Sequence, residues 1–368
     1  MEFALSEDQK MLQASISGVL AKVSSLDEVR KVAAGEEGVA DQISAALAEM
    51  GTRQLLVPEI HGGLGLGVLE SALVQEALGA SVSPARFMAG NAMAVEAVKT
   101  GADETQKADW CGQIADGSMT VGVALNELVS RREGAGLTVS STDKSHISLS
   151  GKALFAMEAD DCTHIIVCDA ERKLYLVSAN EGGNLRRRSL TTIDRTRAFT
   201  ELIFDEVSAE LLLGPDNSGK AADRVIALGR ILLAADTLGA AQVMIEKAVA
   251  YAQERKQFGR VIGSFQSVKH LCAEMAAKLE PARALVWHAA HVFDTEPNRA
   301  GLMACLAKSH ISEVGTFVAR TSTEVHGGMG FTDLAGLHYW FKRIGVNRQL
   351  LGGPEKCRED AARLQAWT

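Results

Sequence analysis

YAQERKQFG, residues 251–259, stands between two long apolar patterns of helical period, at 224–252 and 265–293. An arginine beside a glycine at a helix end can hold a phosphate, because its planar guanidinium donates two parallel hydrogen bonds. Taken alone, however, the segment is more simply a surface turn with a salt bridge. The rest of the chain is needed to choose between the two interpretations.

Outward from this segment, the chain divides into three parts. A third helical pattern at 301–326 follows the first two, so residues 216–368 are expected to form a helical bundle. Residues 119–215 contain short β-branched runs separated by turn residues, which predict a small antiparallel β domain, a barrel or a sandwich. The expected strands are 120–125, 137–141, 146–150, 163–169, 174–178 and 199–204.

Residues 1–118 carry helix signals again. Ser6 is a predicted N-cap, followed by first-turn acids. The apolar pattern at 42–50 is expected to end at Gly51, and the pattern at 69–78 at Gly79. The predicted fold class is therefore α+β, mainly α, with a helical N-terminal domain, a β middle domain and a C-terminal bundle.

The composition of the chain excludes several classes of protein and of site. Of the 368 residues, 47% are hydrophobic and 23% charged, a balance typical of a globular protein. The net charge of −8 argues against a nucleic-acid surface, and the basic clusters at 131–132 and 186–188 are expected to be solvated loops. The six cysteines form no CxxC pair and no histidine stands at ligand spacing, so neither a disulfide framework nor a metal site is expected.

The N-terminus, MEFALSEDQKML, lacks a basic region followed by an apolar stretch, so no signal peptide is expected. No run reaches the ~18 to 20 apolar residues that span a bilayer. These features predict a cytoplasmic protein without a membrane span.

Three more segments complete a fixed order with 251–259. VPEIHGGLGL (57–66) is a glycine-rich turn, and DRTR (194–197) leads into FDEV (204–207). EVHGGMGF (324–331) places paired glycines at a helix end, where backbone N–H groups can approach a diphosphate closely. Each segment alone is weak evidence for any protein family, but the four segments in this order form a specific pattern.

The four segments and the three-part architecture together resemble the acyl-CoA dehydrogenase family over essentially the whole chain. The resemblance implies that the C-terminal bundle has four helices and that FAD is bound at a subunit interface. The implied reaction is oxidation of an acyl-CoA thioester to the α,β-enoyl form, with electron transfer to an electron-transferring flavoprotein. It also implies residues that hold the ADP half of an FAD belonging to a neighbouring subunit. The matching positions are Arg255, Gln257, Phe258, Gln266, Glu324, Gly327 and Gly328.

Glu324 departs from the family, which commonly has glutamine there. A carboxylate cannot donate a hydrogen bond and repels phosphate unless it is protonated or paired. His326 or Arg255 is the expected source of any compensation. Glu324 is therefore a match by position only.

The catalytic base is a second departure. Removing the thioester α-proton calls for a base, and a desolvated carboxylate suits because burial raises its pKa. The family keeps a glutamate at one of two positions, which here are QLLGGP (349–354) and Gly229, immediately ahead of Arg230. Neither holds an acid, so no catalytic residue is assigned. The nearby acids are expected to be solvated helix charges: Asp223, Asp236, Glu246 and Glu355.

The middle domain departs as well. The family usually has a Thr-Glu-Pro and a Gly-Ser-Asp turn that contact flavin and substrate. This chain has ALNELVS (124–130) and then Arg131 and Arg132.

The leading hypothesis is a base-lacking subunit of a heteromeric (α2β2) acyl-CoA dehydrogenase, paired with a base-bearing chain. The family uses such assemblies for bulky substrates such as steroid-derived CoA thioesters. Two alternatives remain open: a self-sufficient flavoenzyme with an atypical base or none, and a non-catalytic interaction protein that has lost flavin.

Overall fold

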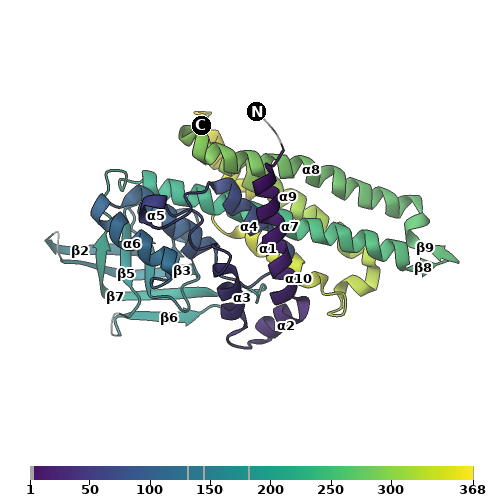
Figure 1. Ribbon diagram of the computed structural model, residues 1–368, viewed down its shortest axis with the longest axis horizontal. Coiled ribbons are helices and arrows are strands. Elements are labelled where there is room, and N and C mark those ends of the chain that lie inside the picture. Colours follow the sequence, from purple (N-terminus) through teal and green to yellow (C-terminus); the bar gives the residue numbers. More distant parts are fainter. Residues whose placement is uncertain (1–3, 131, 144–145, 181–182, 368) are drawn as a thin grey trace.

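The structure, a computed structural model, describes residues 4–130, 132–143, 146–180 and 183–367. The molecule is elongated (Figure 1): the β-sheet lies at one end, and the long C-terminal helices run to a hairpin, β8–β9, at the other. Helices of the N-terminal part pack between these ends. One large hydrophobic cluster contains residues of all three parts, such as Val95, Val123 and Leu228, so the parts share a core.

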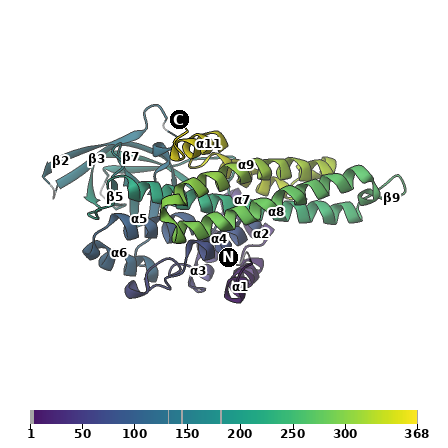
Figure 2. The ribbon, with the colours of Figure 1, turned by 90° about the horizontal axis from the view of Figure 1, so that it is seen from above.

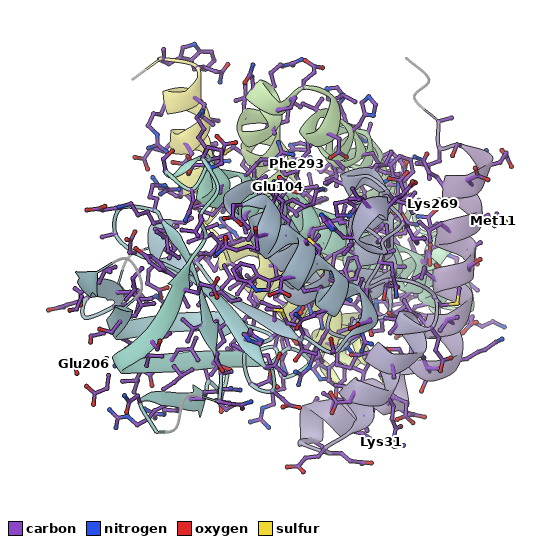
Figure 3. The ribbon with its side chains drawn as sticks, turned by 60° about the vertical axis from the view of Figure 1, so that its left-hand side comes forward. Met11, Lys31, Glu104, Glu206, Lys269 and Phe293 are labelled. Atoms are coloured by element: carbon purple, nitrogen blue, oxygen red, sulfur yellow. The ribbon has the colours of Figure 1, made fainter. Side chains whose placement is uncertain are left out.

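The N-terminal part is helical, as predicted. Ser6 is the N-cap of the first helix, because its hydroxyl accepts the N–H of Gln9 and the Gln9 side chain accepts the N–H of Ser6. Figure 3 shows Met11 and Lys31 at the outer surface, whereas Phe293 of the C-terminal part is buried. The elements are α1 (Glu7–Val23), α2 (Leu26–Ala34), α3 (Val39–Ala48), η1 (Glu59–His61), α4 (Val68–Ala80), η2 (Met88–Met93), α5 (Ala94–Gly101) and α6 (Glu104–Asp116).

Gly79 does not end a helix, contrary to the prediction, because α4 continues through it to Ala80. A Cβ at Gly79 would lie 2.0 Å from the carbonyl oxygen of Asp236, on the helix α7 (Lys220–Glu254). A Cβ at Gly239 of α7 would lie 1.9 Å from the carbonyl oxygen of Glu76 on α4. Both glycines are needed because the two helix backbones touch where they cross.

The middle part is a seven-stranded sheet with β2-β3-β1-β4-β5-β7-β6 order, in which β3 also pairs with β7 and closes the barrel. The pairings in this sheet are antiparallel except that of β1 with β4, which is parallel, so the predicted antiparallel barrel is correct with that exception. The elements are β1 (Val121–Ala124), η3 (Asn126–Leu128), β2 (Gly136–Asp143), β3 (His146–Met157), β4 (His164–Cys168), β5 (Leu174–Ser178), β6 (Leu185–Ser189) and β7 (Phe199–Leu211).

The basic run 186–188 lies in a strand, not in the predicted solvated loop. It belongs to β6, which pairs with β7 at the edge of the sheet. The guanidinium of Arg187 turns back and donates to the carbonyl oxygen of Ala179 at 2.7 Å. Three consecutive arginines hide the strand because they lack the β-branched pattern. Of the other basic pair, Arg131 lies outside the described residues and Arg132 is exposed.

The C-terminal part contains the three predicted long helices and two shorter ones. Helix α7 is long and apolar enough to cross a membrane, but 89% of its apolar stretch is buried inside the protein, as in a core helix. Figure 2 shows α7, α8 and α9 side by side, with α11 against α9 near the sheet. The elements after α7 are β8 (Lys256–Gln257), β9 (Arg260–Val261), η4 (Ile262–Ser264), α8 (Gln266–Thr295), α9 (Pro297–His326), η5 (Gly327–Phe331), α10 (Leu337–Gln349) and α11 (Pro354–Leu364).

A buried ion network joins the middle and the C-terminal parts of the chain. Arg343 of α10 donates to Asp194, which follows β6, at 2.7 Å and lies 3.4 Å from Asp236 on α7. Arg197 and Asn347 also donate to Asp236, both at 2.6 Å. The prediction that Asp236 is a solvated helix charge is wrong, since this side chain is fully buried. Its charge is balanced within the protein.

Candidate functional site

The seven predicted cofactor-binding residues lie at the end of the bundle that is farthest from the sheet. The β8–β9 hairpin, which follows the C-cap of α7, marks this end in Figure 1. The first helical turn of α8 and the last turn of α9 lie there as well. All seven side chains or glycine backbones are exposed: Arg255, Gln257, Phe258, Gln266, Glu324, Gly327 and Gly328.

Two aromatic rings join the two motifs that carry these residues. Tyr251 of α7 stacks on His326 of α9 with ring centroids 4.6 Å apart. Burial lowers the pKa of His326, so its ring is neutral near pH 7, and its Nδ1 lies 2.8 Å from the carbonyl oxygen of Ser322. A neutral imidazole cannot compensate the charge of Glu324, so of the two expected sources of compensation only Arg255 remains.

The bundle end fits the ADP half of a dinucleotide. A Cβ at Gly327 or Gly328 would meet nothing within 4 Å, so a phosphate can approach the backbone there. Within the described residues, the Arg255 guanidinium makes no ion pair or hydrogen bond. Phe258 is 92% exposed, so its ring is free to contact the adenine ring of a nucleotide. Its backbone has a φ of 50°. Each group is therefore available to a ligand.

The two positions at which the family keeps its glutamate are in contact with each other. A Cβ at Gly229 on α7 would lie 2.4 Å from Cδ1 of Leu351, which directly precedes Gly352. It would also lie 2.9 Å from Cε of Met93. Leu351 and Met93 are fully buried. The place where a base would stand is thus filled by apolar side chains.

Residues 350–353, called the plug below, are held by side chains from three elements: η3, α7 and α9. Leu351 has a φ of 52°, its N–H donates to Oδ1 of Asn126 at 3.3 Å, and its carbonyl oxygen accepts from Nε of Arg230 at 2.9 Å. Nζ of Lys308 on α9 lies 3.4 Å from the carbonyl oxygen of Gly352. Because three side chains hold its backbone, the plug is a fixed part of the core.

No base at the plug is supplied by Asp360, Asp223, Glu246 or Glu355. Asp360 cannot act as the base, because Nη2 of Arg230 donates to its carboxylate at 2.7 Å. Burial would raise the pKa of this carboxyl, but hydrogen bonds from Arg230 and Lys356 lower it. Asp223 pairs with Arg172. Asp223, Glu246 and Glu355 are exposed, which confirms the prediction of solvated helix charges for these three.

The middle-domain segment 124–130, which replaces the family's flavin-contacting turn, does not fit an isoalloxazine ring. A Cβ at Gly352 would lie 2.9 Å from Cγ1 of Val129, so the turn packs directly against the plug. The carboxylate of Glu127 accepts the N–H of Leu154 at 2.7 Å, and the side-chain oxygen of Asn126 is used by the plug. Polar groups that would contact a flavin are thus occupied inside the protein.

A long distance separates the predicted cofactor residues at the bundle end from Gly229, one of the two positions of the family's base. Gly229 and Arg255 are 26 positions apart along α7 and its C-cap, which corresponds to about 39 Å at about 1.5 Å per residue. An extended dinucleotide is shorter than this. A cofactor held at the bundle end of this chain therefore cannot place its ring beside Gly229 of the same chain.

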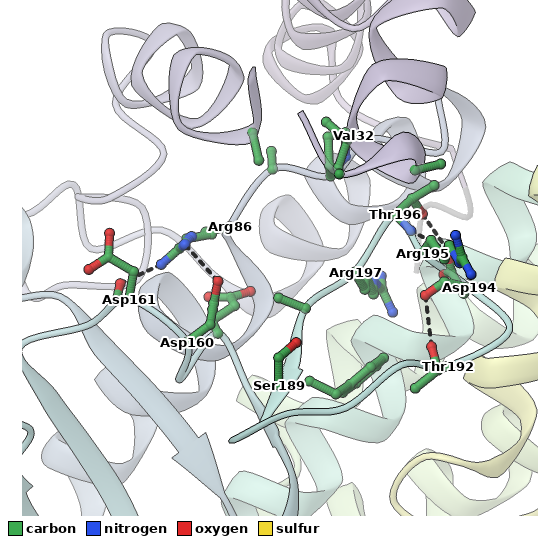
Figure 4. A pocket seen from close by; sticks show the side chains of 18 of the residues that line it. Val32, Arg86, Asp160, Asp161, Ser189, Thr192, Asp194, Arg195, Thr196 and Arg197 are labelled. Atoms are coloured by element: carbon green, nitrogen blue, oxygen red, sulfur yellow. Dashed lines mark hydrogen bonds and ion pairs between the residues drawn. The ribbon is translucent and has the colours of Figure 1, made fainter. Parts of the chain in front are cut away.

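A cavity of about 720 Å³ opens at a different place, between the loop after α2 and the segments 83–88 and 189–199 (Figure 4). None of the seven predicted residues lines it. It does contain the DRTR segment (194–197), which the sequence indicated only as the polar end of a strand.

Lys308 provides a pH-dependent prediction. Burial lowers the pKa of Lys308 to about 8, below the ordinary lysine value, so between about pH 8 and 10.5 the unfolded chain binds more protons than the folded one and stability rises with pH. We expect the free energy of unfolding of the wild type, relative to Lys308→Met, to rise by about 2–3 kcal/mol over this window. Urea titrations at several pH values measure it, and parallel curves for the two proteins would contradict it.

Two protein-family models match the chain. The acyl-CoA dehydrogenase N-terminal domain matches residues 6–118, and the acyl-CoA dehydrogenase C-terminal domain matches residues 217–364. Among curated proteins, the chain is 27% identical over 363 residues to acyl-CoA dehydrogenase IpdE2 of Mycolicibacterium smegmatis, covering 98% of this chain and 99% of that protein. It is 26% identical over 344 residues to the caffeyl-CoA reductase-Etf complex subunit CarC of Acetobacterium woodii, covering 89% of each.

The chain also superposes on solved structures over essentially its whole length. A variant of the Tcur3481-Tcur3483 steroid ACAD superposes with a TM-score of 0.87 at 27% identity, over 98% of both chains. The ChsE4-ChsE5 complex from Mycobacterium tuberculosis contains a chain that superposes with a TM-score of 0.90 at 22% identity, over 100% of both chains. The second likeness concerns the fold alone.

Proposed function

The chain belongs to the acyl-CoA dehydrogenase family, and on that premise we propose that it is the base-lacking subunit of a two-chain, FAD-dependent enzyme that desaturates an acyl-CoA thioester. The contact between Gly229 and Leu351 carries the proposal. Both positions at which a glutamate is expected meet at one point, and this point holds a glycine and a leucine.

The chemistry explains why this contact matters. Desaturation removes a proton from the α-carbon and a hydride from the β-carbon, and FAD, when bound, supplies the hydride acceptor. The proton must go to a base within hydrogen-bond reach of the α-carbon. Leu351 and Gly229 cannot accept it, and Met93 and Leu351 occupy the space that the acyl chain would need. The partner chain is therefore the one that binds and deprotonates the substrate.

The contribution of this chain lies at its bundle end. Arg255 would pair with the diphosphate of the partner's FAD, Gly327 and Gly328 would let that diphosphate approach the backbone, and Phe258 would contact the adenosine side. Glu324 faces the same region and opposes the phosphate charge, which Arg255 offsets. The length of α7 supports this division, because the bundle end and the plug are too far apart to serve one cofactor.

Relatives support the choice of substrate class and electron acceptor. The 27% identical Tcur3481-Tcur3483 protein is described as a steroid ACAD, and CarC as a subunit of an Etf complex. We propose a bulky, steroid-type CoA thioester as the substrate of the assembly and an electron-transferring flavoprotein as its electron acceptor.

Co-expression with any acyl-CoA dehydrogenase-like chain that is encoded nearby tests the proposal. We expect a stable complex with one FAD for each pair of chains, and acyl-CoA-dependent dye reduction that the isolated chain does not show. A homotetramer with full flavin and activity would support the self-sufficient alternative and overturn the proposal. Colourless protein in every co-expression would support the interaction-protein alternative instead.

Arg255→Ala tests the role of the bundle end. We expect the affinity of the complex for FAD to fall by about 10- to 100-fold, because a charge-assisted bidentate contact with phosphate is lost. Flavin retention during ultrafiltration measures the change. The exposed neighbour Lys256→Ala is the matched control and should retain its flavin. Equal retention by both variants would exclude Arg255 as a phosphate ligand.

A further inference from the structure

The β8–β9 hairpin, at the far end of the bundle in Figure 1, has two distinct faces. Both residues of its two-residue turn, 258–259, have a positive φ, as the tight turns of β-hairpins often require. The Cα partners across the hairpin are Gln257 with Arg260, and Lys256 with Val261. Cross-strand partners share a face and successive residues alternate. Gln257 and Arg260 therefore project from one face, and Lys256 and Val261 from the other.

Arg255 belongs to the same face as Gln257. Its backbone is extended, with a φ of −67° and a ψ of 123°, and it stands two positions before Gln257. Its carbonyl oxygen accepts the N–H of Ile262 at 2.7 Å, which continues the pairing of the two strands. One face of the hairpin thus carries Arg255, Gln257 and Arg260. The first two are predicted cofactor residues, whereas Arg260 is a second guanidinium that no motif indicated.

An aromatic ring holds Arg260 in place. Its Cζ lies 4.0 Å from the centroid of the Phe265 ring, a favourable position for a cation. Phe265 meets Phe258 edge-on, with centroids 6.1 Å apart, and directly precedes Gln266. Stacking uses the flat side of the guanidinium and leaves the N–H groups at its edge free. Arg260 is exposed and forms no ion pair with any residue that the structure describes, so these donors are available to a ligand.

The charge at the bundle end requires a second cation. Glu324 stands at this end and opposes Arg255, and a dinucleotide adds one negative charge on each of its two phosphates. Arg255 alone cannot offset these charges. Lys256 projects from the other face of the hairpin, so it is not placed to help. Arg260 shares the face of Arg255 and supplies the missing charge.

We propose that Arg260 is a second phosphate ligand at the bundle end, and that with Arg255 it makes the site selective for a diphosphate over a single phosphate. The proposal rests on the proposed function, in which this end holds the ADP half of the partner's FAD. Phe265 is a positioning residue in this arrangement. Because its ring orders the guanidinium before the ligand arrives, less side-chain freedom is lost on binding.

The test uses the isolated full-length chain, with ADP-ribose and AMP as probes and ligand-observed NMR as the measurement. At about pH 8 the two probes carry nearly the same charge, but ADP-ribose has a diphosphate and AMP a single phosphate. We expect a dissociation constant for ADP-ribose on the order of 1 mM. Arg260→Ala should weaken ADP-ribose about tenfold, because a charge-assisted contact is lost. AMP should weaken less than about threefold, because Arg255 still serves its one phosphate.

Two further variants separate this role from general charge attraction. Lys256→Ala removes a charge from the opposite face of the hairpin, and its affinity for ADP-ribose should stay within about twofold of the wild type. Arg260→Lys keeps the charge but loses the planar group that stacks on Phe265, so its affinity should lie between those of the wild type and Arg260→Ala. Thermal unfolding checks that each variant is folded.

The outcomes distinguish this proposal from the proposed function. If Arg255→Ala weakens ADP-ribose and Arg260→Ala does not, Arg260 is no phosphate ligand while the role of the bundle end stands. If Lys256→Ala weakens it as much as Arg260→Ala, or if AMP weakens as much as ADP-ribose, the selectivity for a diphosphate is wrong. If the wild type binds no ADP-ribose, the proposed role of the bundle end fails, and the role of Arg260 fails with it.

Discussion

Replacement of Arg343 by methionine is expected to lower the free energy of unfolding by about 3–5 kcal/mol, the cost typical of breaking a buried ion pair from one side. Arg343 is fully buried, donates to Asp194 at 2.7 Å and lies 3.4 Å from Asp236. Without it, Asp194 is left as a buried charge with no guanidinium at hydrogen-bond distance. Urea or thermal unfolding of the isolated chain measures the loss.

The control for this variant is Arg299→Met. Arg299 forms an exposed pair with Glu296 at 2.7 Å, and such pairs contribute about 0–1 kcal/mol, so this variant should unfold almost as the wild type does. Although burial would raise the pKa of Asp194, the Arg343 guanidinium lowers it, so wild-type stability from this pair is present above pH 4 and is lost as pH falls. A loss below 1 kcal/mol in Arg343→Met would contradict the role of the network.

Leu351→Glu places a carboxyl where the family carries its base, and we expect it to destabilise the chain by roughly 3–6 kcal/mol without creating activity. The side chain at 351 is fully buried against Gly229 and Met93, and the plug holds its backbone in place. A carboxyl there loses its water and lies among apolar side chains. The expected result is a weakly stable chain that does not reduce dye with acyl-CoA.

The matched control is Leu351→Met, which keeps the volume and the apolar character and should cost less than about 1.5 kcal/mol. Comparing the two variants isolates the effect of polarity at this position. If Leu351→Glu were as stable as Leu351→Met, the core around Gly229 would not be closed as described. If it desaturated an acyl-CoA alone, the chain would possess a usable substrate cleft and the two-chain proposal would fail.

The architecture was predictable from local pattern. Apolar residues at helical spacing gave α7, α8 and α9, and β-branched runs gave most strands. Two errors have physical causes. The sequence predicts a helix end at Gly79 because glycine often ends a helix, yet here it allows a backbone contact with a helix far along the chain. The β6 strand was missed because arginines on an edge strand carry no periodic apolar signal.

The candidate site was predictable only in part. The sequence shows that no acid stands at 229 or at 349–354, but not that Leu351 meets Gly229, since that contact depends on tertiary packing. The burial of Asp236 could not be predicted for the same reason, because its partners come from three separate segments. Lys308 had a usable signal: it lies on a helix stripe with Ala304 and Ile311, which predicts burial. Asn126 had none.

The crossing of α4 and α7 limits which residues evolution can accept. Positions 79 and 239 each face a carbonyl oxygen about 2 Å from where a Cβ would stand, so related sequences that keep this crossing should show glycine at both. Gly35 and Gly38 differ, because a Cβ there meets nothing within 4 Å and only the positive φ restricts them. Asparagine should therefore recur at the latter two positions and be absent from the former.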